Sequence, residues 1–159
     1  MAIDRTGAVW TQHKPTIAVS RSLWAAAKAN DVGQLARLLD EGSPIDERDH
    51  RGYSALMLAG YCGNLAAVEL LLAHGADPNT ADFFGNTVLM GVAYKGFAKI
   101  AQRLLIAGAD LDATNVGGLD ARGFALTYGR TEVLTVLEQH AERVASQSIT
   151  LPEGPKTIN

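Results

Sequence analysis

The side chains that could support catalysis are one cysteine and four histidines. Cys62 is the only thiol of the 159-residue chain, and the histidines are His13, His50, His74 and His140. A nucleophilic thiol needs a general base within hydrogen-bond reach, and His50 is the only base that the same stretch of sequence offers. His50 itself has no cysteine or carboxylate at metal-ligand spacing. We therefore expect no catalytic residue, no metal site and no cofactor, and keep a thiol enzyme centred on Cys62 as the weakest alternative.

The sequence signatures of common enzyme classes give no stronger candidate. The chain has no G-x-S-x-G, no phosphate-loop motif and no H-E-x-x-H. The segment GVAYKG at 91–96 has two glycines and Lys95. A phosphate loop joins a strand to a helix, whereas the repeat register given below places this segment inside a helix. It is therefore not expected to bind phosphate.

The composition is that of a water-soluble domain with a slight negative charge. The net charge is −3, which gives no general basic footprint for nucleic acid. No stretch approaches the roughly 18–20 apolar residues of a membrane span, and the longest apolar run near the N-terminus, at 17–19, is too short for a signal-peptide core. A single cysteine makes no internal disulfide and mildly favours a reducing compartment. We expect a cytoplasmic protein with neither nucleic-acid nor membrane partners.

A repeat of 33 residues runs through most of the chain. The Gly-Ala-Asp at 75–77, in LAAVELLLAHGADPNT (65–80), recurs 33 residues later at 108–110, in FAKIAQRLLIAGADLD (97–112), and a period of this length is typical of repeat arrays. Four series of residues share the register: Gly42, Gly75 and Gly108; Asp49, Asp82 and Asn115; Gly52, Gly85 and Gly118; and Leu38, Leu71, Leu104 and Leu137.

Each unit predicts a turn followed by two helices. Asp-x-x-Gly is typical of a turn, because the Asx side chain bonds nearby backbone and Gly supplies an unusual backbone angle. Ser54, Thr87 and Asp120 stand two residues later, where a helix N-cap belongs. A short helix is expected to end near the next glycine at 63, 96 or 129, and a more apolar helix follows it. Neither helix buries its apolar face alone, so the units must stack.

The ends of the chain depart from this period. We expect an extended arm at 1–20 with Trp10 as its only large group, and a repeat domain at 21–143. Its units are expected at about 21–48, 49–81, 82–114 and 115–143. A tail follows at 144–159, although residues 141–148 could extend the last helix.

The segments DHRGYSALMLAGYCGN at 49–64 and VELLLAHGADPN at 68–79 resemble an ankyrin repeat. The family pattern is D-x-x-G-x-T-P-L-H-x-A-A-x-x-G-H followed by V-x-x-L-L-x-x-G-A-D-x-N. The resemblance covers about residues 21–140 and is to small stand-alone ankyrin-repeat proteins of bacterial type. It implies an all-α solenoid of about four helix-turn-helix units, of which the first and last act as caps. Arg122 stands where leucine is usual, so the last unit either frays or gains a polar contact.

The resemblance also implies that a protein partner docks on the concave face, built from turn tips and first-helix ends. The corresponding columns hold six of the ten aromatic residues of the chain, whereas core columns hold Leu, Ala and Val. Aromatic anchors commonly dominate binding energy at interfaces. Lys28 adds positive charge in the first unit. The candidate partner-binding residues are Tyr53, Tyr61, Phe83, Phe84, Tyr94 and Tyr128 together with Lys95, Arg51 and His50.

These columns predict a non-catalytic protein-binding module, a regulator, inhibitor or adaptor that is a monomer or a weak homodimer. Three alternatives stay open beside the thiol enzyme. The aromatic face could close a homodimer, or the chain could be a structural spacer. In the third, the rings serve no partner: either Phe83 or Phe84 folds back to brace the turns, or the N-terminal arm covers them.

Overall fold

The computed structural model describes residues 22–148, which form eight α-helices and no strand. Ala81 and Thr87 make an isolated antiparallel bridge at the base of one loop. The helices follow one another in pairs along the chain, as the 33-residue period predicts. Their bounds are α1 Leu23–Ala29, α2 Val32–Asp40, α3 Ala55–Cys62, α4 Leu65–Ala73, α5 Val88–Lys95, α6 Ala98–Ile106, α7 Ala121–Thr127 and α8 Thr131–Ser148.

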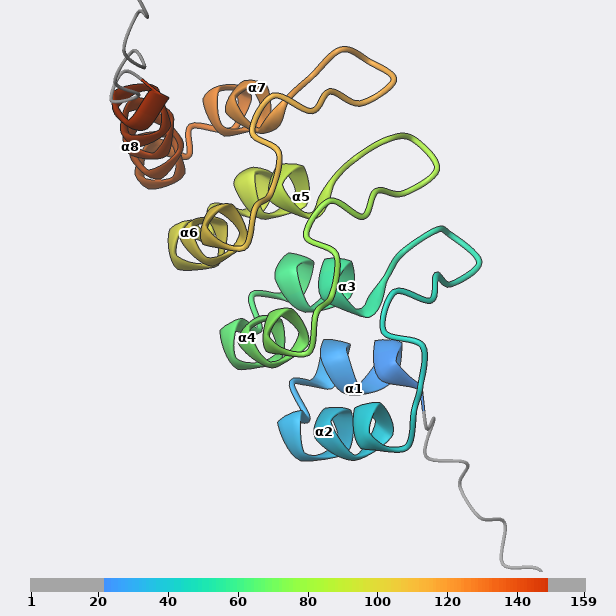
Figure 1. Ribbon diagram of the computed structural model, residues 1–159. Helices are drawn as coiled ribbons and strands as arrows, with labels where there is room; N and C mark the ends of the chain where they lie inside the picture. The colour runs from blue at the N-terminus through green and yellow to red at the C-terminus, as the bar shows by residue number, and fades with distance from the viewer. Residues whose placement is uncertain (1–21, 149–159) are drawn as a thin grey trace, which may run out of the picture.

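The four helix pairs stack into a solenoid (Figure 1). The first helices of the pairs pack in the order α1, α3, α5 and α7, and the second helices pack in the order α2, α4, α6 and α8. Three long loops, before α3, α5 and α7, project on the same side of the stack (Figure 1). The all-α solenoid of four units is therefore confirmed.

Side-chain caps begin the first helices where the sequence predicts them. The Ser54 hydroxyl accepts a hydrogen bond from the Met57 N–H at 3.2 Å, and Thr87 does the same for Met90 at 3.3 Å. The Asp120 carboxylate accepts the Gly123 N–H at 2.7 Å. Each cap satisfies one of the free N–H groups of the first helical turn, which fixes where the helix begins.

A leucine column forms the centre of the core. Leu71, Leu104 and Leu137 are fully buried and Leu38 is 6% exposed, so one residue of each second helix lies inside the stack. The neighbouring repeat removes these side chains from water, because a single pair of short helices has no interior of its own. The 33-residue spacing of these leucines therefore reflects the stacking of each repeat on the next.

Asx turns shape the three loops. One carboxylate oxygen of Asp49 accepts the N–H groups of Arg51 and Tyr53 at 2.9 and 2.8 Å. Asp82 and Asn115 make the same pair of bonds in the next two loops. The predicted Asp-x-x-Gly turns are therefore present.

The second and third loops are also joined to each other. The Asn115 amide donates to Asn86 Oδ1 at 2.8 Å, and the Val116 N–H donates to the Phe84 carbonyl at 3.0 Å. Bonds of this kind hold successive loops in register, so residues at equivalent positions project side by side.

The ends of the repeat region are ordered helices. α8 continues to Ser148, five residues beyond the expected domain end at 143 and along the 141–148 extension considered above. The expected arm at 1–20, with Trp10, and the tail beyond 148 lie outside the described residues. None of the helices between residues 22 and 148 combines the length and apolarity that crossing a bilayer requires.

Candidate functional site

A groove of about 820 Å³ runs across the repeats, between the loops and the first helices. Its walls come from α1, α3, α5 and α7 and from the first two loops, so no single repeat forms it. Six of the nine predicted partner-binding residues line it. The lining includes Arg51, Tyr53, Tyr61, Tyr94, Lys95 and Tyr128, together with Lys28, Cys62, Asp82 and Phe124.

Aromatic rings form a continuous row within this groove. The rings of Tyr61 and Tyr94 are nearly parallel, at 9°, with centroids 6.2 Å apart. Tyr128 meets Tyr94 edge to face at 4.5 Å and stacks at 6.5 Å on Phe124. Offset-stacked and edge-to-face pairs are the arrangements that aromatic quadrupoles favour. The row therefore joins α3, α5 and α7 through side chains on their exposed ends.

The spacing of the rings follows from the register only in part. Tyr61 and Tyr94 are 33 residues apart and occupy equivalent positions in α3 and α5. Tyr128 corresponds instead to Lys95, one position further along the helix. It reaches Tyr94 because α7 ends at Thr127, so that Tyr128 itself caps the helix.

Positive charge accompanies the rings. The Lys95 ammonium group lies over the Tyr61 ring, 4.6 Å from its centroid, and this is a cation–π distance. Lys28 and Arg51 are exposed at the groove wall. The groove thus combines aromatic surface with lysine and arginine side chains from three different repeats.

The burial of the rings differs from the expectation in one respect. Tyr61 and Tyr128 are each 47% exposed, as predicted for a binding surface. Tyr53 and Tyr94 are half-buried, and Tyr53 packs against the hydrophobic core. Among the candidate partner-binding residues, Tyr53 therefore offers less surface than Tyr61 or Tyr128, because its ring packs on the stack.

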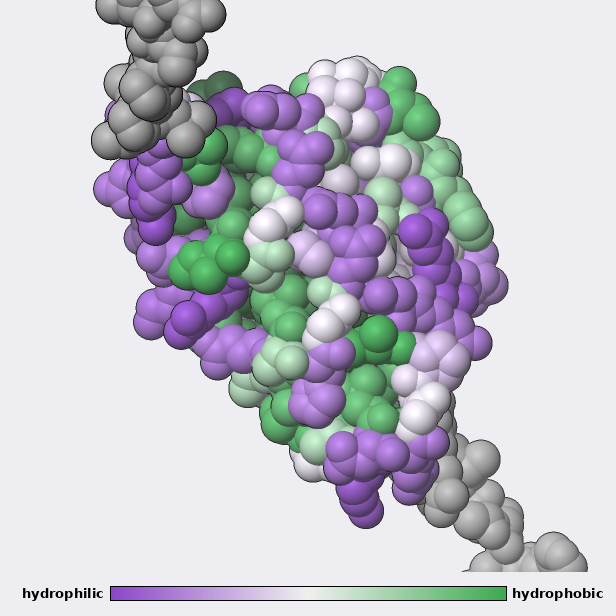
Figure 2. Space-filling model, in the orientation of Figure 1, coloured by the Kyte–Doolittle hydropathy of each residue, from purple (hydrophilic) through white to green (hydrophobic). Residues whose placement is uncertain are grey.

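Three predicted residues lie on the loop tips and not in the groove. Phe83 and Phe84 are 68% and 67% exposed, and His50 is exposed on the preceding tip. Figure 2 shows hydrophobic residues at the projecting ends of the second and third loops, on the right of the view, and hydrophilic residues at the first. The tips therefore form a second surface beside the groove.

Phe83 also braces the turns, as one alternative proposed. A Cβ added to Gly52 would lie 3.2 Å from Phe83 Cδ1, so the ring packs directly on the backbone of the preceding loop. The φ of Gly52 is +83°, which favours glycine as well. Phe83 thus contacts the neighbouring loop with one part of its ring and solvent with the rest.

The sequence reasoning missed Phe124. Its equivalents in the two preceding units are Leu58 and Gly91, which gave no aromatic pattern. A Cβ at Gly91 would lie 3.6 Å from Cδ2 of Tyr61, an ordinary van der Waals distance, so the Tyr61 ring lies directly beside this position of α5. Extending the inspected columns by one helical turn would have found Phe124.

The thiol and the histidines give no catalytic grouping in the described part of the chain. Cys62 is a free, exposed thiol, and none of the hydrogen bonds among residues 22–148 joins it to a base. The His74 ring nitrogen Nδ1 lies 2.9 Å from the Leu70 carbonyl, so that histidine closes the end of α4. Within residues 22–148, no group of three or more metal-ligating side chains comes together.

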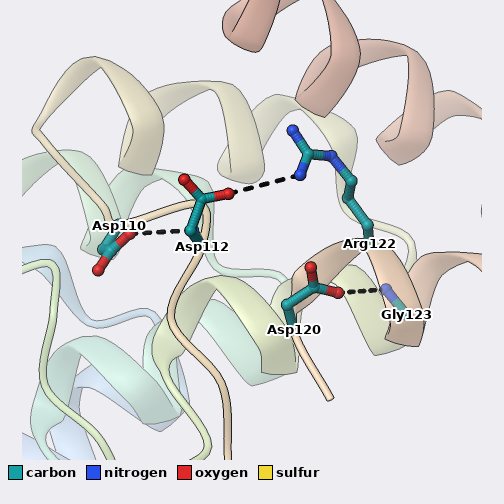
Figure 3. Close-up of polar contacts among 5 residues, drawn as sticks. All are labelled: Asp110, Asp112, Asp120, Arg122 and Gly123. Atoms are coloured by element: carbon teal, nitrogen blue, oxygen red, sulfur yellow. Dashed lines mark hydrogen bonds and ion pairs between the residues drawn. The ribbon is translucent and has the colours of Figure 1, made fainter. Parts of the chain in front are cut away.

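Arg122 makes a polar contact at the outer end of the stack. Its guanidinium lies 3.5 Å from the Asp112 carboxylate, while Asp120 caps the helix beside it (Figure 3). The equivalent Leu56 and Leu89 are fully buried, but the Arg122 side chain is 33% exposed. Of the two alternatives, the last unit therefore gains a contact and keeps its helix.

Asp49 is the described carboxylate whose pKa clearly departs from its ordinary value. Desolvation by its surroundings raises the pKa, but the N–H groups of Tyr53 and Arg51 and the charges of His50 and Arg51 together lower it further. The net result is a pKa below the ordinary value of an aspartate. Folding of the loop therefore stabilises the ionised form of Asp49.

Comparison with known proteins agrees with this architecture. Residues 23–115 match the family model described as ankyrin repeats (3 copies), which is more than half of the chain. The chain therefore belongs to the ankyrin-repeat family. Domains of this family are typically non-enzymatic and generally mediate protein–protein interaction. α7 and α8, with the unusual Arg122, lie beyond the matched stretch.

Two curated relatives share a shorter stretch. The mitochondrial disaggregase of Bos taurus is 45% identical over 52 residues, which is 33% of this chain and 8% of the relative. That of Homo sapiens is 42% identical over 52 residues, or 33% of this chain and 7% of the relative. The matched part is thus less than a tenth of either relative. Both are mammalian, so they give no support to the expected bacterial type.

Proposed function

We propose that this protein binds a protein partner through the tyrosine-lined groove, without catalysis, and acts as a regulator, inhibitor or adaptor. The observation that carries the proposal is the row of Tyr61, Tyr94, Tyr128 and Phe124 across three repeats. Concave surfaces of this kind are the usual binding faces of solenoid proteins. The proposal includes a cytoplasmic location, with which the free thiol of Cys62 agrees.

The rings suit an interface better than a purely structural purpose. Tyr61 and Tyr128 each leave almost half of their surface in water, although buried leucines already hold the repeats together. A central aromatic anchor typically contributes about 2 kcal/mol or more to binding. A cluster of exposed rings that is never covered would instead promote aggregation.

The loop tips extend the proposed interface. Phe83 and Phe84 are exposed beside the groove, and His50 adds a polar group at the first tip. Because hydrogen bonds join the second and third loops, a partner would meet Phe83 and Phe84 without ordering those loops first. Less conformational entropy is then lost on binding.

The decisive experiment compares two double variants in affinity capture from an extract of the source cells. Tyr61→Ala/Tyr94→Ala removes the centre of the row, and Ile106→Ala/Val144→Ala removes two exposed apolar side chains outside the groove. Partners are quantified by mass spectrometry, and circular dichroism checks the fold. We expect the control to keep the partners of the wild type and the tyrosine variant to lose them. Retention by a folded tyrosine variant would refute the proposal.

Self-association is the competing use of the same surface. If the groove closed a homodimer, light scattering would give a dimer mass for the wild type. The Tyr61→Ala/Tyr94→Ala variant would then have the mass of a monomer. We expect the wild type to remain a monomer, or at most to dimerise weakly at high concentration. The short match to the disaggregases covers too little of those proteins to carry their activity to this chain.

A further inference from the structure

The charge of the groove is opposite to that of the chain. The whole sequence carries −3, yet Lys28, Arg51 and Lys95 line the groove and Asp82 is the one acidic residue in its described wall. The three cations come from α1, from the first loop and from α5, so they are spread along the groove. A partner surface laid into it therefore meets positive charge at several points.

These cations form no salt bridge within the described residues. The two ion pairs among residues 22–148 join Arg103 to Glu69 and Arg122 to Asp112, and none of these four residues lines the groove. Neither Lys28 nor Arg51 forms a salt bridge with a described carboxylate, although the charge of Arg51 acts on Asp49, two residues away in the same loop. Lys95 is in neither salt bridge, and its ammonium group lies over a tyrosine ring, which attracts a cation but leaves its charge uncompensated.

The carboxylate of Asp82, the acidic residue of the wall, already accepts hydrogen bonds from its own loop. One oxygen of the Asp82 carboxylate accepts the N–H groups of Phe84 and Asn86, and the other accepts the Asn86 side-chain amide at 3.0 Å. Three donors from its own loop thus hold this charge. Both of its oxygens are therefore bonded within the loop, and three cations face one carboxylate in the groove wall.

The tyrosine hydroxyls also suit a partner that carries carboxylates. None of the hydroxyls of Tyr53, Tyr61, Tyr94 and Tyr128 forms a hydrogen bond with another described residue. A phenol O–H donates readily to a carboxylate, and such charge-assisted bonds are stronger than neutral ones. The groove therefore offers carboxylates both cations and neutral donors, and offers apolar side chains the faces of the rings.

We propose that the partner presents an acidic peptide segment, in which aspartate or glutamate side chains alternate with aromatic or aliphatic ones. This inference rests on the proposed function and specifies its ligand. The carboxylates meet Lys28, Arg51 and Lys95, while the apolar side chains pack on Tyr61 and Tyr128. Complementary charge of this kind speeds association and rejects basic partners.

Single-stranded nucleic acid, which is also anionic, fits the groove less well. Proteins that bind single strands combine a basic channel that follows the phosphates with rings that take up the bases, whereas this chain carries a net charge of −3. A base held between two rings needs about 7 Å from ring to ring, since each contact takes about 3.5 Å. Tyr61 and Tyr94 are 6.2 Å apart, and Tyr128 closes the other side of Tyr94 edge to face.

The experiment is selection of a random peptide library displayed on phage against the intact protein. The test variant is Lys28→Glu/Arg51→Glu/Lys95→Glu, and the control is Arg37→Glu/Lys99→Glu/Arg143→Glu. Both change the net charge by the same amount, but the control residues are exposed outside the groove. Selected peptides are sequenced and synthesised, and their affinities are measured by fluorescence anisotropy beside labelled oligo-dT.

We expect the wild type and the control to select peptides rich in Asp and Glu, and the test variant to select basic ones. The triple reversal should weaken binding of an acidic peptide about tenfold or more, because three charge pairs at the groove wall change sign. Binding by the wild type should also weaken as salt is raised.

The failures of the two proposals are distinguishable. Peptides that need Tyr61 and Tyr94 but show no acidic enrichment would overturn the acidic ligand and leave the groove as the binding site. Peptides that bind Tyr61→Ala/Tyr94→Ala as well as the wild type would overturn both proposals, and so would a selection that yields no peptide. Tighter binding of oligo-dT than of acidic peptides would overturn the peptide ligand.

Discussion

The ammonium group of Lys95 lies 4.6 Å from the centre of the Tyr61 ring, although the two residues belong to neighbouring repeats. The contact links α5 to α3 at the groove wall. It places a charge and an aromatic face where one ligand side chain could touch both.

The Lys95–Tyr61 pair should couple the stabilities of two repeats. Lys95→Gln keeps a polar chain and removes the charge, whereas Tyr61→Leu keeps an apolar side chain and removes the ring. A double-mutant cycle in urea should give a coupling of about 0.5 kcal/mol, because the site is solvent-exposed. Strictly additive effects would show that the cation contributes nothing to the fold.

Gly63→Ala should destabilise the stack more than Gly75→Ala does. Both glycines have positive φ, of +79° and +87°, so alanine costs about 1 kcal/mol at either site from the backbone alone. At Gly63 the new Cβ would also lie 2.7 Å from Cζ of the Phe97 ring, while nothing lies within 4 Å at Gly75. Urea unfolding measures both. Equal losses would mean that the ring shifts aside freely.

Phe97→Leu offers a control for that comparison. The smaller side chain should recover part of the stability lost in Gly63→Ala and none of that lost in Gly75→Ala. The reason is that the Phe97 ring packs on the backbone at Gly63 only.

Asp49 should make the first loop sensitive to acid. Its pKa is lowered in the fold, so its ionised form stabilises the native state above the unfolded pKa of about 3.9. That contribution is lost as the pH falls through the lower folded value. NMR titration of the side chain should give a pKa below that of an unfolded peptide, and an unshifted value would contradict the prediction.

Asp49→Asn provides the matched variant. Asn115 makes the same two turn bonds in the third loop, so asparagine should keep the turn. We expect the wild type to be the more stable at pH 7 and the two proteins to converge as the pH falls below about 4. A constant difference across this range would assign the effect to geometry and not to charge.

Arg122→Leu should stabilise the last unit. The Arg122–Asp112 pair is exposed at 33% and 85%, and such pairs contribute little. Leucine would restore the residue that is fully buried at Leu56 and Leu89. The gain should be about 1 kcal/mol in urea unfolding. Asp112→Asn, which removes only the charge, should change stability by a few tenths of a kcal/mol or less.

Much of the fold could be predicted because its information is periodic and local. Ser54, Thr87 and Asp120 predict where the first helices begin, because each side chain accepts a hydrogen bond from a backbone N–H of the first turn. Leu71 and Leu104 recur because every unit buries the same position against its neighbour. Each of these signals needs only the residues of one unit and the period that repeats it.

The candidate site could be predicted only in outline. The register brings Tyr61 and Tyr94 to equivalent positions, and the structure places both in the groove. The register does not reveal that Tyr53 turns back to the core or that Phe124 joins the row, because both depend on how side chains meet between units.

The sequence by itself therefore determined the repeat, its caps and turns, and the residue types that each unit presents. The tertiary structure decided which of those residues meet. Tyr128 touches Tyr94 across unequal columns, and Lys28, Arg51 and Lys95 share one groove although no two of them come from the same helix. Such neighbours are fixed by the offset and stacking of whole helices, a long-range property that no single unit encodes.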